Sequence, residues 1–267
     1  MKVTILGCGT SGGVPRIGGA GRAGHWGAWG AADPTNPLNR RLRCSILVQD
    51  AGKTLLVDTS PDCRQQLLAA EVARIDAVLW THDHADQMHG IDDLRALALR
   101  DGPIEAWADE RTMAVLRRRF GYCFTTEEAG FYNPIYRGNI VRGPFAAAGL
   151  PVVPFEQDHG TMISLGFRFG AIGYANDVVH MGEQGFAALA GVEVLIVDAM
   201  RYKPHPTHAH LELTLRWIER IRPKRAVLTN LHVDMDYATL RRELPDGVEP
   251  AYDGMAIKVE NGHISIG

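Results

Sequence analysis

The sequence predicts a layered α/β protein built from one domain that spans residues 1–267. Two observations support this prediction. Short apolar segments, several of them β-branched, recur along the whole chain, and segments with helically spaced apolar residues lie between them. No linker divides these segments, and strands and helices bury their apolar faces by packing against one another in layers.

The first half of the chain alternates predicted strands with loops and helices. A glycine-rich loop at 7–13 follows the first strand but lacks the Lys-Ser/Thr of a P-loop. We therefore expect a backbone turn near the functional site, with a phosphate-binding loop as the alternative. Residues 17–38 show no period, which predicts a functional flap or a disordered segment. The predicted strands are 3–6, 44–48, 54–57 and 75–80, and the predicted helices are 62–70 and 91–99.

The second half repeats a pattern in which an apolar strand leads directly to polar residues. Three of the polar tips contain His159, Asp177 and His232, and a fourth begins at Asp198. Each of these residues alone is explained by a turn, a cap or a buried histidine, but their recurrence favours convergence at one edge. The predicted strands are 152–155, 167–173, 192–197 and 226–228, and the predicted helix is 211–221.

Composition excludes several classes of protein. The chain has no run of about 18 apolar residues, so no membrane-spanning helix is expected, and its first residues lack the features of a signal peptide. The four cysteines form no Cys-x-x-Cys pair, which argues against a disulfide framework and a zinc knuckle. The net charge of −3 predicts no binding of long nucleic acid. We expect a cytoplasmic enzyme with a small substrate.

The segment from Thr81 to Gly90 carries the strongest functional signal. It contains two imidazoles and a carboxylate at alternate positions, and three of the 11 histidines of the chain. Imidazole and carboxylate together suit Zn, Mn or Fe better than Ca or Mg. The alternative is a solvated loop. No Gly-x-Ser-x-Gly elbow is present, so a metal site with one or two ions fits better than a serine hydrolase.

At these residues the chain resembles the metallo-β-lactamase fold and, within it, the phosphodiesterases of the carbon–phosphorus lyase pathway. The resemblance covers nearly the whole chain. The motifs that carry it are Asp58, His82-x-His84-x-Asp86, His159, Asp177, Gly7-x-Gly-Thr-Ser-Gly-Gly-Val-Pro15, Asn39-Arg-Arg-x-Arg-x-Ser45, Val57-Asp-Thr-Ser-Pro-Asp62, Pro204-His-Pro-Thr-His208 and Tyr252-Asp-Gly-Met255.

The resemblance implies a four-layer αββα sandwich with two metal ions. It implies that His82, His84 and His159 bind the first metal and that Asp177 bridges the two. Asp86 would bind the second metal. Asp58 would not bind the metal itself but would orient a metal-binding imidazole, and His208 would act on the phosphate as an acid or a ligand.

Two departures from the family pattern affect the second metal. Gln87 and Asn230 stand where the family has histidine. Three outcomes stay open: a single metal, a second site that holds Mn or Fe, or rescue of the second site by another histidine that binds the metal in place of the missing ones. The candidates for rescue are His89, His210 and His232. A further zinc found in close relatives is not expected here, since the flap has no cysteine and Val233 replaces a histidine.

These residues predict a phosphodiesterase that acts on a small cyclic phosphate or nucleotide-like ester through a metal-bound hydroxide. Zn or Mn is the expected metal, with Fe as the alternative. Asp86 would orient or deprotonate the water, and His208 would protonate the leaving oxygen.

Substrate contacts are predicted from two groups of residues. Arg40, Arg41 or Arg43 would bind the phosphate, unless this basic run is only a solvated surface. Trp26 or Trp29 would stack on a base or sugar, with simple burial as the preferred alternative. Two other functions are weighed: thioester, lactone or β-lactam hydrolysis on the same fold, and a metal-bearing carrier with a degenerate second site. A homodimer is left open.

Overall fold

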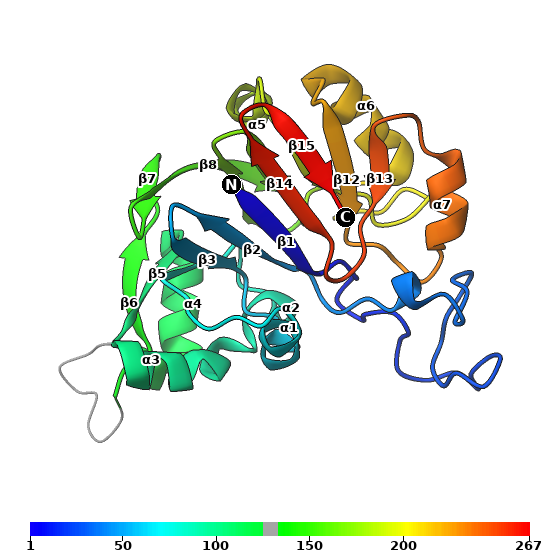
Figure 1. Ribbon diagram of the computed structural model, residues 1–267. Helices are drawn as coiled ribbons and strands as arrows, with labels where there is room; N and C mark the ends of the chain where they lie inside the picture. The colour runs from blue at the N-terminus through cyan, green and yellow to red at the C-terminus, as the bar shows by residue number, and fades with distance from the viewer. Residues whose placement is uncertain (125–132) are drawn as a thin grey trace. The chain divides into compact units, whose positions relative to one another are not determined.

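The computed structural model describes residues 1–124 and 133–267 (Figure 1). These residues form two compact units. Unit 1 comprises Met1–Leu6, Ser45–Val152 and Ala256–Gly267, and unit 2 comprises Gly7–Cys44 and Val153–Met255. Each unit is therefore assembled from segments that are distant in sequence. The prediction that residues 1–267 act as one domain with a flap stays a prediction.

Unit 1 contains an eight-stranded sheet whose second half is parallel. Strands β3 to β6 run parallel to one another, so their carboxyl ends lie at one edge of the sheet. Asp58 directly follows β3, and Trp80 and Thr81 follow β4. The strand order is β15 (His263–Ile266), β14 (Ala256–Glu260), β1 (Lys2–Gly7), β2 (Ser45–Asp50), β3 (Lys53–Val57), β4 (Ala77–Leu79), β5 (Ile104–Ala108) and β6 (Tyr136–Ile140).

Helices pack on this sheet around a buried core. Trp80 is fully buried, its indole N–H donates to the Thr59 hydroxyl at 3.0 Å, and its ring meets that of Tyr136 edge to face. The Tyr136 hydroxyl donates to the carbonyl of Ile91 at 2.6 Å, so each polar edge of this aromatic pair is satisfied. The helices are α1 (Cys63–Ala69), α2 (Ala85–Met88), η2 (Ile91–Leu94), α3 (Arg95–Asp101), α4 (Glu110–Phe120), which packs on β5 and β6, and η3 (Gly121–Cys123).

The second sheet has seven strands, and four of them form its parallel part. Strands β10 to β13 run parallel, so the residues after β10, β11 and β12 lie at one edge. The strand order is β13 (Val248–Pro250), β12 (Arg225–Thr229), β11 (Val194–Asp198), β10 (Ile172–Ala175), β9 (Ile163–Phe169), β8 (Leu150–Asp158), which begins in unit 1, and β7 (Phe145–Ala147) of unit 1. The helices of unit 2 are η1 (Pro37–Asn39), α5 (Glu183–Leu189), α6 (Leu211–Ile221) and α7 (Tyr237–Glu243).

The structure corrects two of the predicted elements. Residues 167–173, predicted as one strand, are the end of β9 and the start of β10, and Gly170 turns the chain between them with a φ of 53°. The apolar residues on both sides of this tight turn conceal it in the sequence. The helix predicted at 91–99 is divided into η2 and α3. Helix α6, by contrast, covers 211–221 as predicted.

The irregular segment at 17–38 is anchored in unit 2. Apart from the start of η1, it contains no helix or strand among its residues, all of which the structure describes. Trp29 is buried and packs in a small cluster with Val14, Ala32 and Val233. The segment is therefore held by this tryptophan together with backbone hydrogen bonds, including a mutual pair between Arg22 and His25 and one from the Ala32 N–H to the Val233 carbonyl. Its role as a flap stays a prediction.

A buried carboxylate ties the glycine-rich loop to the segment before β14. Asp253 accepts hydrogen bonds from the backbone N–H groups of Cys8 at 3.0 Å and Leu42 at 2.7 Å. Burial raises the pKa of Asp253 to about 7, although these N–H bonds and the nearby Arg41 act in the opposite direction. The folded protein consequently holds the proton on Asp253 more tightly than the unfolded chain does.

We expect this carboxyl to make unit 2 less stable as the pH rises. Because its pKa is higher in the folded protein than in the unfolded chain, the free energy of unfolding falls between pH 4 and 7, by up to about 1.4 kcal/mol per pH unit. Urea denaturation from pH 4 to 8 measures this slope. In Asp253→Asn the slope should be shallower, and an identical slope in both proteins would contradict the assignment.

Candidate functional site

In unit 1, the predicted metal-binding motif follows strand β4. His82 is buried, its Nδ1 lies 3.0 Å from the Thr81 hydroxyl, and its Nε2 lies 2.9 Å from Nδ1 of His84. His84 is exposed and precedes the first turn of α2. The turn between β4 and α2 thus brings the two predicted imidazole ligands together.

Asp58 fixes the orientation of His82 through Thr81. The buried Asp58 carboxylate accepts the Thr81 N–H at 2.8 Å and the Thr81 O–H at 2.9 Å. A hydroxyl has one hydrogen, so Thr81 can only accept from His82, which must carry its proton on Nδ1. The lone pair of His82 therefore lies on Nε2. Asp58 adopts a left-handed φ of 64°, as befits a residue at a sharp strand end.

Helix α2 places the remaining predicted residues of unit 1. Asp86 lies in its first turn and is partly exposed, whereas Gln87 is buried. The Gln87 amide nitrogen donates to the Asp86 carboxylate at 3.1 Å. His89, one of the candidates for rescue, ends the helix and packs its ring edge to face against Phe120 at 5.8 Å.

In unit 2, His159 directly follows strand β8, and its tautomer is fixed. The ring is buried, and its Nδ1 lies 2.7 Å from the carbonyl oxygen of Thr207. A carbonyl can only accept, so Nδ1 carries the proton and Nε2 carries the lone pair. His159 and His82 are therefore both prepared to bind a cation through Nε2, each by a hydrogen bond on the opposite nitrogen.

Asp177 follows β10 and is buried among neutral donors. The side-chain amide of Asn176 donates to Asp177 Oδ2 at 2.7 Å, and that of Asn230 to Oδ1 at 3.3 Å. The Ser164 hydroxyl holds its backbone carbonyl at 2.8 Å. Like Asp58, Asp177 has a left-handed φ, here 54°. The strand end and these bonds fix the carboxylate in one position.

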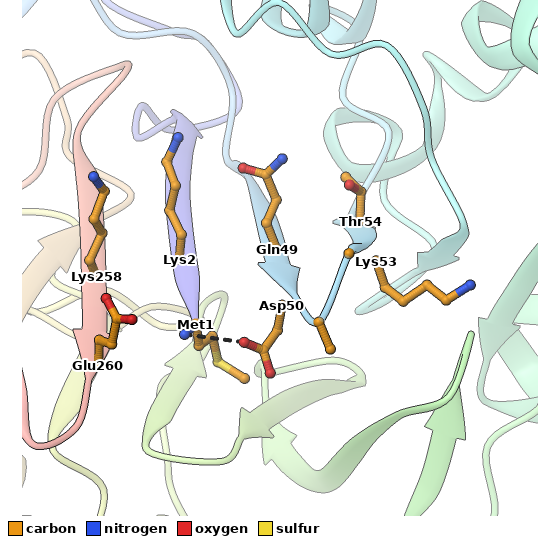
Figure 2. Close-up of a pocket in the computed structure, with 10 residues that line it drawn as sticks. Met1, Lys2, Gln49, Asp50, Lys53, Thr54, Lys258 and Glu260 are labelled. Carbon is orange, nitrogen blue, oxygen red and sulfur yellow. Dashed lines mark ion pairs between the residues drawn. The ribbon is translucent and has the colours of Figure 1, made fainter.

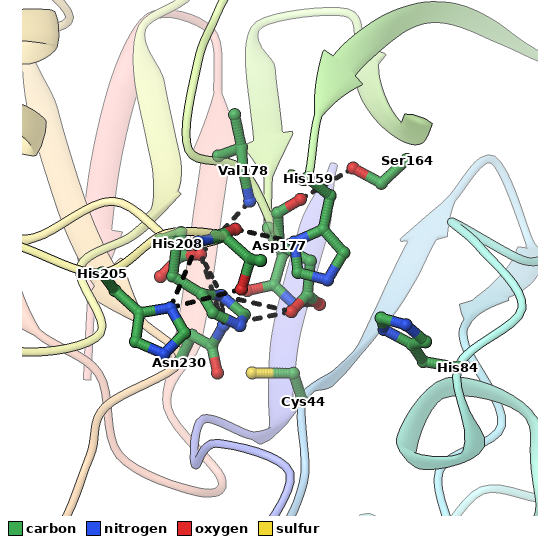
Figure 3. A network of polar contacts seen from close by, with 12 residues as sticks. Cys44, His84, His159, Ser164, Asp177, Val178, His205, His208 and Asn230 are labelled. Atoms are coloured by element: carbon green, nitrogen blue, oxygen red, sulfur yellow. Dashed lines mark hydrogen bonds and ion pairs between the residues drawn. The ribbon is translucent and has the colours of Figure 1, made fainter. Parts of the chain in front are cut away.

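His208 is oriented by a carboxylate that sequence reasoning did not select, Asp198 at the end of β11. His208 Nδ1 lies 3.0 Å from Asp198 Oδ2 and 3.5 Å from Asp177 Oδ1, and its ring packs edge to face on His159 (Figure 3). Asp198 is fully buried, and the Val178 N–H also donates to it at 3.3 Å. Its position after an apolar strand was the available signal, but its partner lies ten residues further along the chain.

Asn230 follows β12 and stands between the two carboxylates of unit 2. Its side-chain nitrogen is 3.3 Å from Asp177 Oδ1, 3.3 Å from Asp198 Oδ2 and 3.1 Å from His208 Nδ1. The amide NH₂ has two hydrogens and two carboxylates to satisfy, so His208 directs its own Nδ1–H to Asp198.

The other predicted histidines of unit 2 make contacts away from the buried carboxylates, and for His210 the contact is through its backbone. Nδ1 of His232 pairs with Asp234 at 3.0 Å, and burial together with Arg16 lowers the pKa of His232. His210 caps α6, where its carbonyl accepts the Thr214 hydroxyl. Neither contact involves a carboxylate of the site. His205 lies near His208, and burial and His208 lower the pKa of His205, which favours its neutral form.

The arginine run divides into different roles. Arg41 is buried and donates to the carbonyls of Met235 at 2.7 Å and His232 at 3.3 Å, so its guanidinium is structural and not a phosphate contact. Arg40 is exposed, lies over the Trp29 ring and approaches Nδ1 of His25. Arg43 is partly buried.

The two tryptophans of the irregular segment also differ. Trp29 is buried, as preferred from the sequence, whereas Trp26 is 77% exposed. Trp26, Arg40 and Arg43 therefore stay predicted substrate contacts.

The donors in each unit fit a transition-metal ion. Two ligands of one tetrahedral zinc ion lie about 3.3 Å apart, close to the 2.9 Å between the nitrogens of His82 and His84. In unit 2, ligand atoms of His159, Asp177 and His208 all lie within 4.8 Å of one another. Imidazole and carboxylate donors with fixed tautomers suit Zn, Mn or Fe.

A separate open groove on unit 1 contains none of the predicted site residues. It has a volume of about 640 Å³, and Lys2 and Lys258 face one another across β1 and β14 beside Gln49 (Figure 2). Asp50 and Glu260 also line the groove, but Asp50 is paired with the N-terminal ammonium at 3.1 Å, and no imidazole is among the lining residues to complete a metal site or an acid–base pair. The groove is therefore not a candidate for the functional site.

Comparison with known proteins identifies related chains. A family model described as a beta-lactamase superfamily domain matches residues 53–230. A solved structure described as a new diphosphatase from the PhnP family is 32% identical, with a TM-score of 0.86, and the match covers 97% of this chain and 98% of that chain. Zn²⁺-bound PqqB from Methylobacterium extorquens is 20% identical, with a TM-score of 0.70 and coverage of 97% and 100%, and this likeness shows the fold alone.

One curated protein also matches. The octanoyltransferase of Porphyromonas gingivalis is 31% identical, and the match covers 100% of this chain but 53% of that protein. The chain thus spans about half the length of this relative. The predicted fold class is confirmed by these likenesses and by the two sheets with their helices. None of the helices in the described ranges has the length and apolar character needed to cross a membrane.

Replacing Asp58 by Asn should disorder His82. Either the N–H or the O–H of Thr81 would then face the side-chain NH₂ of the new asparagine, which cannot accept a hydrogen bond. The proton position on His82 would no longer be fixed. We expect about 1–3 kcal/mol less stability and about 10–100-fold weaker zinc binding. Denaturation and zinc titration measure the two effects. Asp101→Asn, which removes an exposed ion pair, is the control, and equal behaviour of the two variants would contradict the role of Asp58.

Proposed function

Because the chain belongs to the metallo-β-lactamase superfamily and, within it, to the PhnP family, we propose that it is a metal-dependent phosphodiesterase. The proposed substrate is a small cyclic phosphate or a nucleotide-like ester. A small substrate is also favoured by the net charge of −3, since proteins that bind long nucleic acid usually carry an excess of basic residues. We propose a cytoplasmic location, and a homodimer is kept as a proposal for the assembly.

The observation that carries this proposal is the pairing of His208 with the buried Asp198. Asp198 accepts the Nδ1–H of His208 and stabilises the imidazolium, so Nε2 is the atom that can deliver a proton. An alkoxide leaving group needs such a proton, because its conjugate acid is very weak. A thiolate needs it less, since the pKa of a thiol is about 8.5. The pair therefore favours an ester of an alcohol over a thioester.

The family pattern suggests which residues hold the metal. We propose His82, His84 and His159 as imidazole ligands, with Asp177 and Asp86 as carboxylate ligands. Such an ion, Zn or Mn by the donor set and Fe as the alternative, supplies Lewis acidity toward the phosphoryl group and acidity to a coordinated water. Asp58 orients His82, and Asp86 is proposed to orient or deprotonate the attacking water.

Substrate recognition is proposed for residues near the basic run. The exposed Arg40 and the partly buried Arg43 offer forked donors that match phosphate oxygens. Trp26, with 77% of its surface exposed, offers a face for a base or sugar.

A second candidate reaction is cleavage of a diphosphate, because the 32% identical structure is described as a diphosphatase. Both reactions place a nucleophile on phosphorus and expel an oxygen. They differ in the leaving group, since a phosphate leaves more readily than an alkoxide and needs less help from an acid. The response to loss of His208 therefore distinguishes the two candidates.

A substrate panel tests the proposed function. The metal-loaded protein is assayed with bis(p-nitrophenyl) phosphate, 2′,3′-cyclic AMP, a diphosphate diester, p-nitrophenyl acetate and a thioester. The proposal expects chelator-sensitive hydrolysis of a phosphodiester or diphosphate. Turnover of the acetate or thioester alone would favour the alternative hydrolase, and no turnover with metal bound would contradict the proposal and favour the carrier.

Loss of His208 should lower turnover most for the substrates whose leaving group most needs a proton. In His208→Ala we expect turnover of 2′,3′-cyclic AMP to fall about 10²–10⁴-fold, whereas turnover of bis(p-nitrophenyl) phosphate, whose leaving group is already a weak base, falls much less. In Asp198→Asn, turnover should also fall more for 2′,3′-cyclic AMP than for bis(p-nitrophenyl) phosphate, but each loss should be smaller than in His208→Ala. Steady-state kinetics at unchanged metal content measures these effects, and an equal loss with both substrates would remove His208 from the role of acid.

A further inference from the structure

Two side-chain amides occupy positions where the family resemblance implies metal-binding imidazoles. Gln87 follows Asp86 in unit 1, and Asn230 follows β12 in unit 2. Both are buried, with 1% and 3% of their surfaces exposed. Each unit is considered by itself, because each amide has its own carboxylate partner.

In unit 2 the Asn230 amide presents its nitrogen to the carboxylates. The nitrogen lies 3.3 Å from Asp177 and 3.3 Å from Asp198. If the amide were turned over, its carbonyl oxygen would face both carboxylate oxygens and His208 would be its single donor, so the chemistry of the neighbours selects the NH₂ orientation. The other oxygen of Asp177 accepts from Asn176 at 2.7 Å.

In unit 1 the Gln87 amide makes the same kind of contact. Its nitrogen donates to Asp86 Oδ2 at 3.1 Å, within the first turn of α2. For the same reason as at Asn230, the oxygen of this amide is directed away from the carboxylate.

An amide nitrogen has no lone pair to offer a cation, so an amide that binds a metal does so through its oxygen. To become ligands, Gln87 and Asn230 would both have to rotate and give up their bonds to Asp86, Asp177 and Asp198. We propose that these two amides replace a second metal ion, donating N–H groups to the carboxylates that the ion would otherwise neutralise. The chain then binds one transition-metal ion.

Two of the histidines that could complete a second site contact residues other than these carboxylates within their own units. The His89 ring packs on Phe120, and Nδ1 of His232 pairs with Asp234. The backbone of His210 caps α6, and its side chain is the remaining candidate.

This inference rests on the proposed metal-dependent function, and metal stoichiometry tests it without an activity assay. Stripped protein is titrated with zinc by calorimetry and checked by mass spectrometry after dialysis. We expect about one equivalent for the wild type, with any second equivalent bound more than about 100-fold more weakly, since even outer partners of ligands change affinity 10–100-fold. The double variant Gln87→His/Asn230→His should bind two equivalents of comparable affinity.

His210→Ala removes the remaining candidate ligand for a second metal, and it should keep the one equivalent of the wild type. Two equivalents of comparable affinity in the wild type would overturn the inference while leaving the hydrolase proposal intact. No bound metal in any of the proteins would overturn the proposed function and the inference with it. If the double variant does not fold, as judged by circular dichroism, Asn230→His alone and the wild-type stoichiometry decide the question.

Discussion

Burial of carboxylates at the ends of parallel strands is the constraint on which the functional site depends. Asp58 follows β3 in unit 1, whereas Asp177 follows β10 and Asp198 ends β11 in unit 2. All three are almost fully buried, and a buried carboxylate is costly unless donors satisfy it. The residues around these carboxylates therefore supply N–H and O–H groups that donate hydrogen bonds to them. In unit 1 the donor is Thr81, which passes the orientation on to His82. In unit 2 the donors are His208 and three backbone or amide groups.

Much of the fold and the family was predictable from the sequence, and both predictions are confirmed. Short apolar segments followed by polar residues predicted β3, β4, β8, β11 and β12, because a buried strand requires a run of apolar residues that is visible in the sequence. The turn at Gly170 was missed, since a two-residue break between apolar runs carries little signal. Helix α4 and strands β13 to β15 were not predicted, because their identity depends on packing against neighbours distant in sequence.

The candidate site was predictable in its residue types but not in its connections. His82, His159 and Asp177 were selected, and the structure supplies the bonds that set their orientation, although their role as ligands stays a proposal. Asp198 was noted only as the start of a polar strand tip and was given no role, because its importance lies in a contact with His208 that no local pattern reveals. Arg41 looked like a phosphate contact as one of a basic run, yet it is buried against carbonyl groups. A charge pattern does not record which side of the chain faces solvent.

The amides at Gln87 and Asn230 connect the fold to the chemistry. A neutral N–H donor stabilises a carboxylate less than a metal ion does, but it requires no ligand to be acquired from solution. Exchange of imidazole for amide at these positions would preserve the buried carboxylates, and hence the local structure, while changing the number of ions bound. Family membership and a departure from the family's metal content are then compatible in one chain.

The most direct test of the central claim is the turnover of bis(p-nitrophenyl) phosphate by stripped protein as zinc or manganese is restored. The account predicts no turnover without metal and full turnover once about one equivalent is bound. Equal turnover with and without metal, or no turnover by folded, metal-loaded protein, would contradict it.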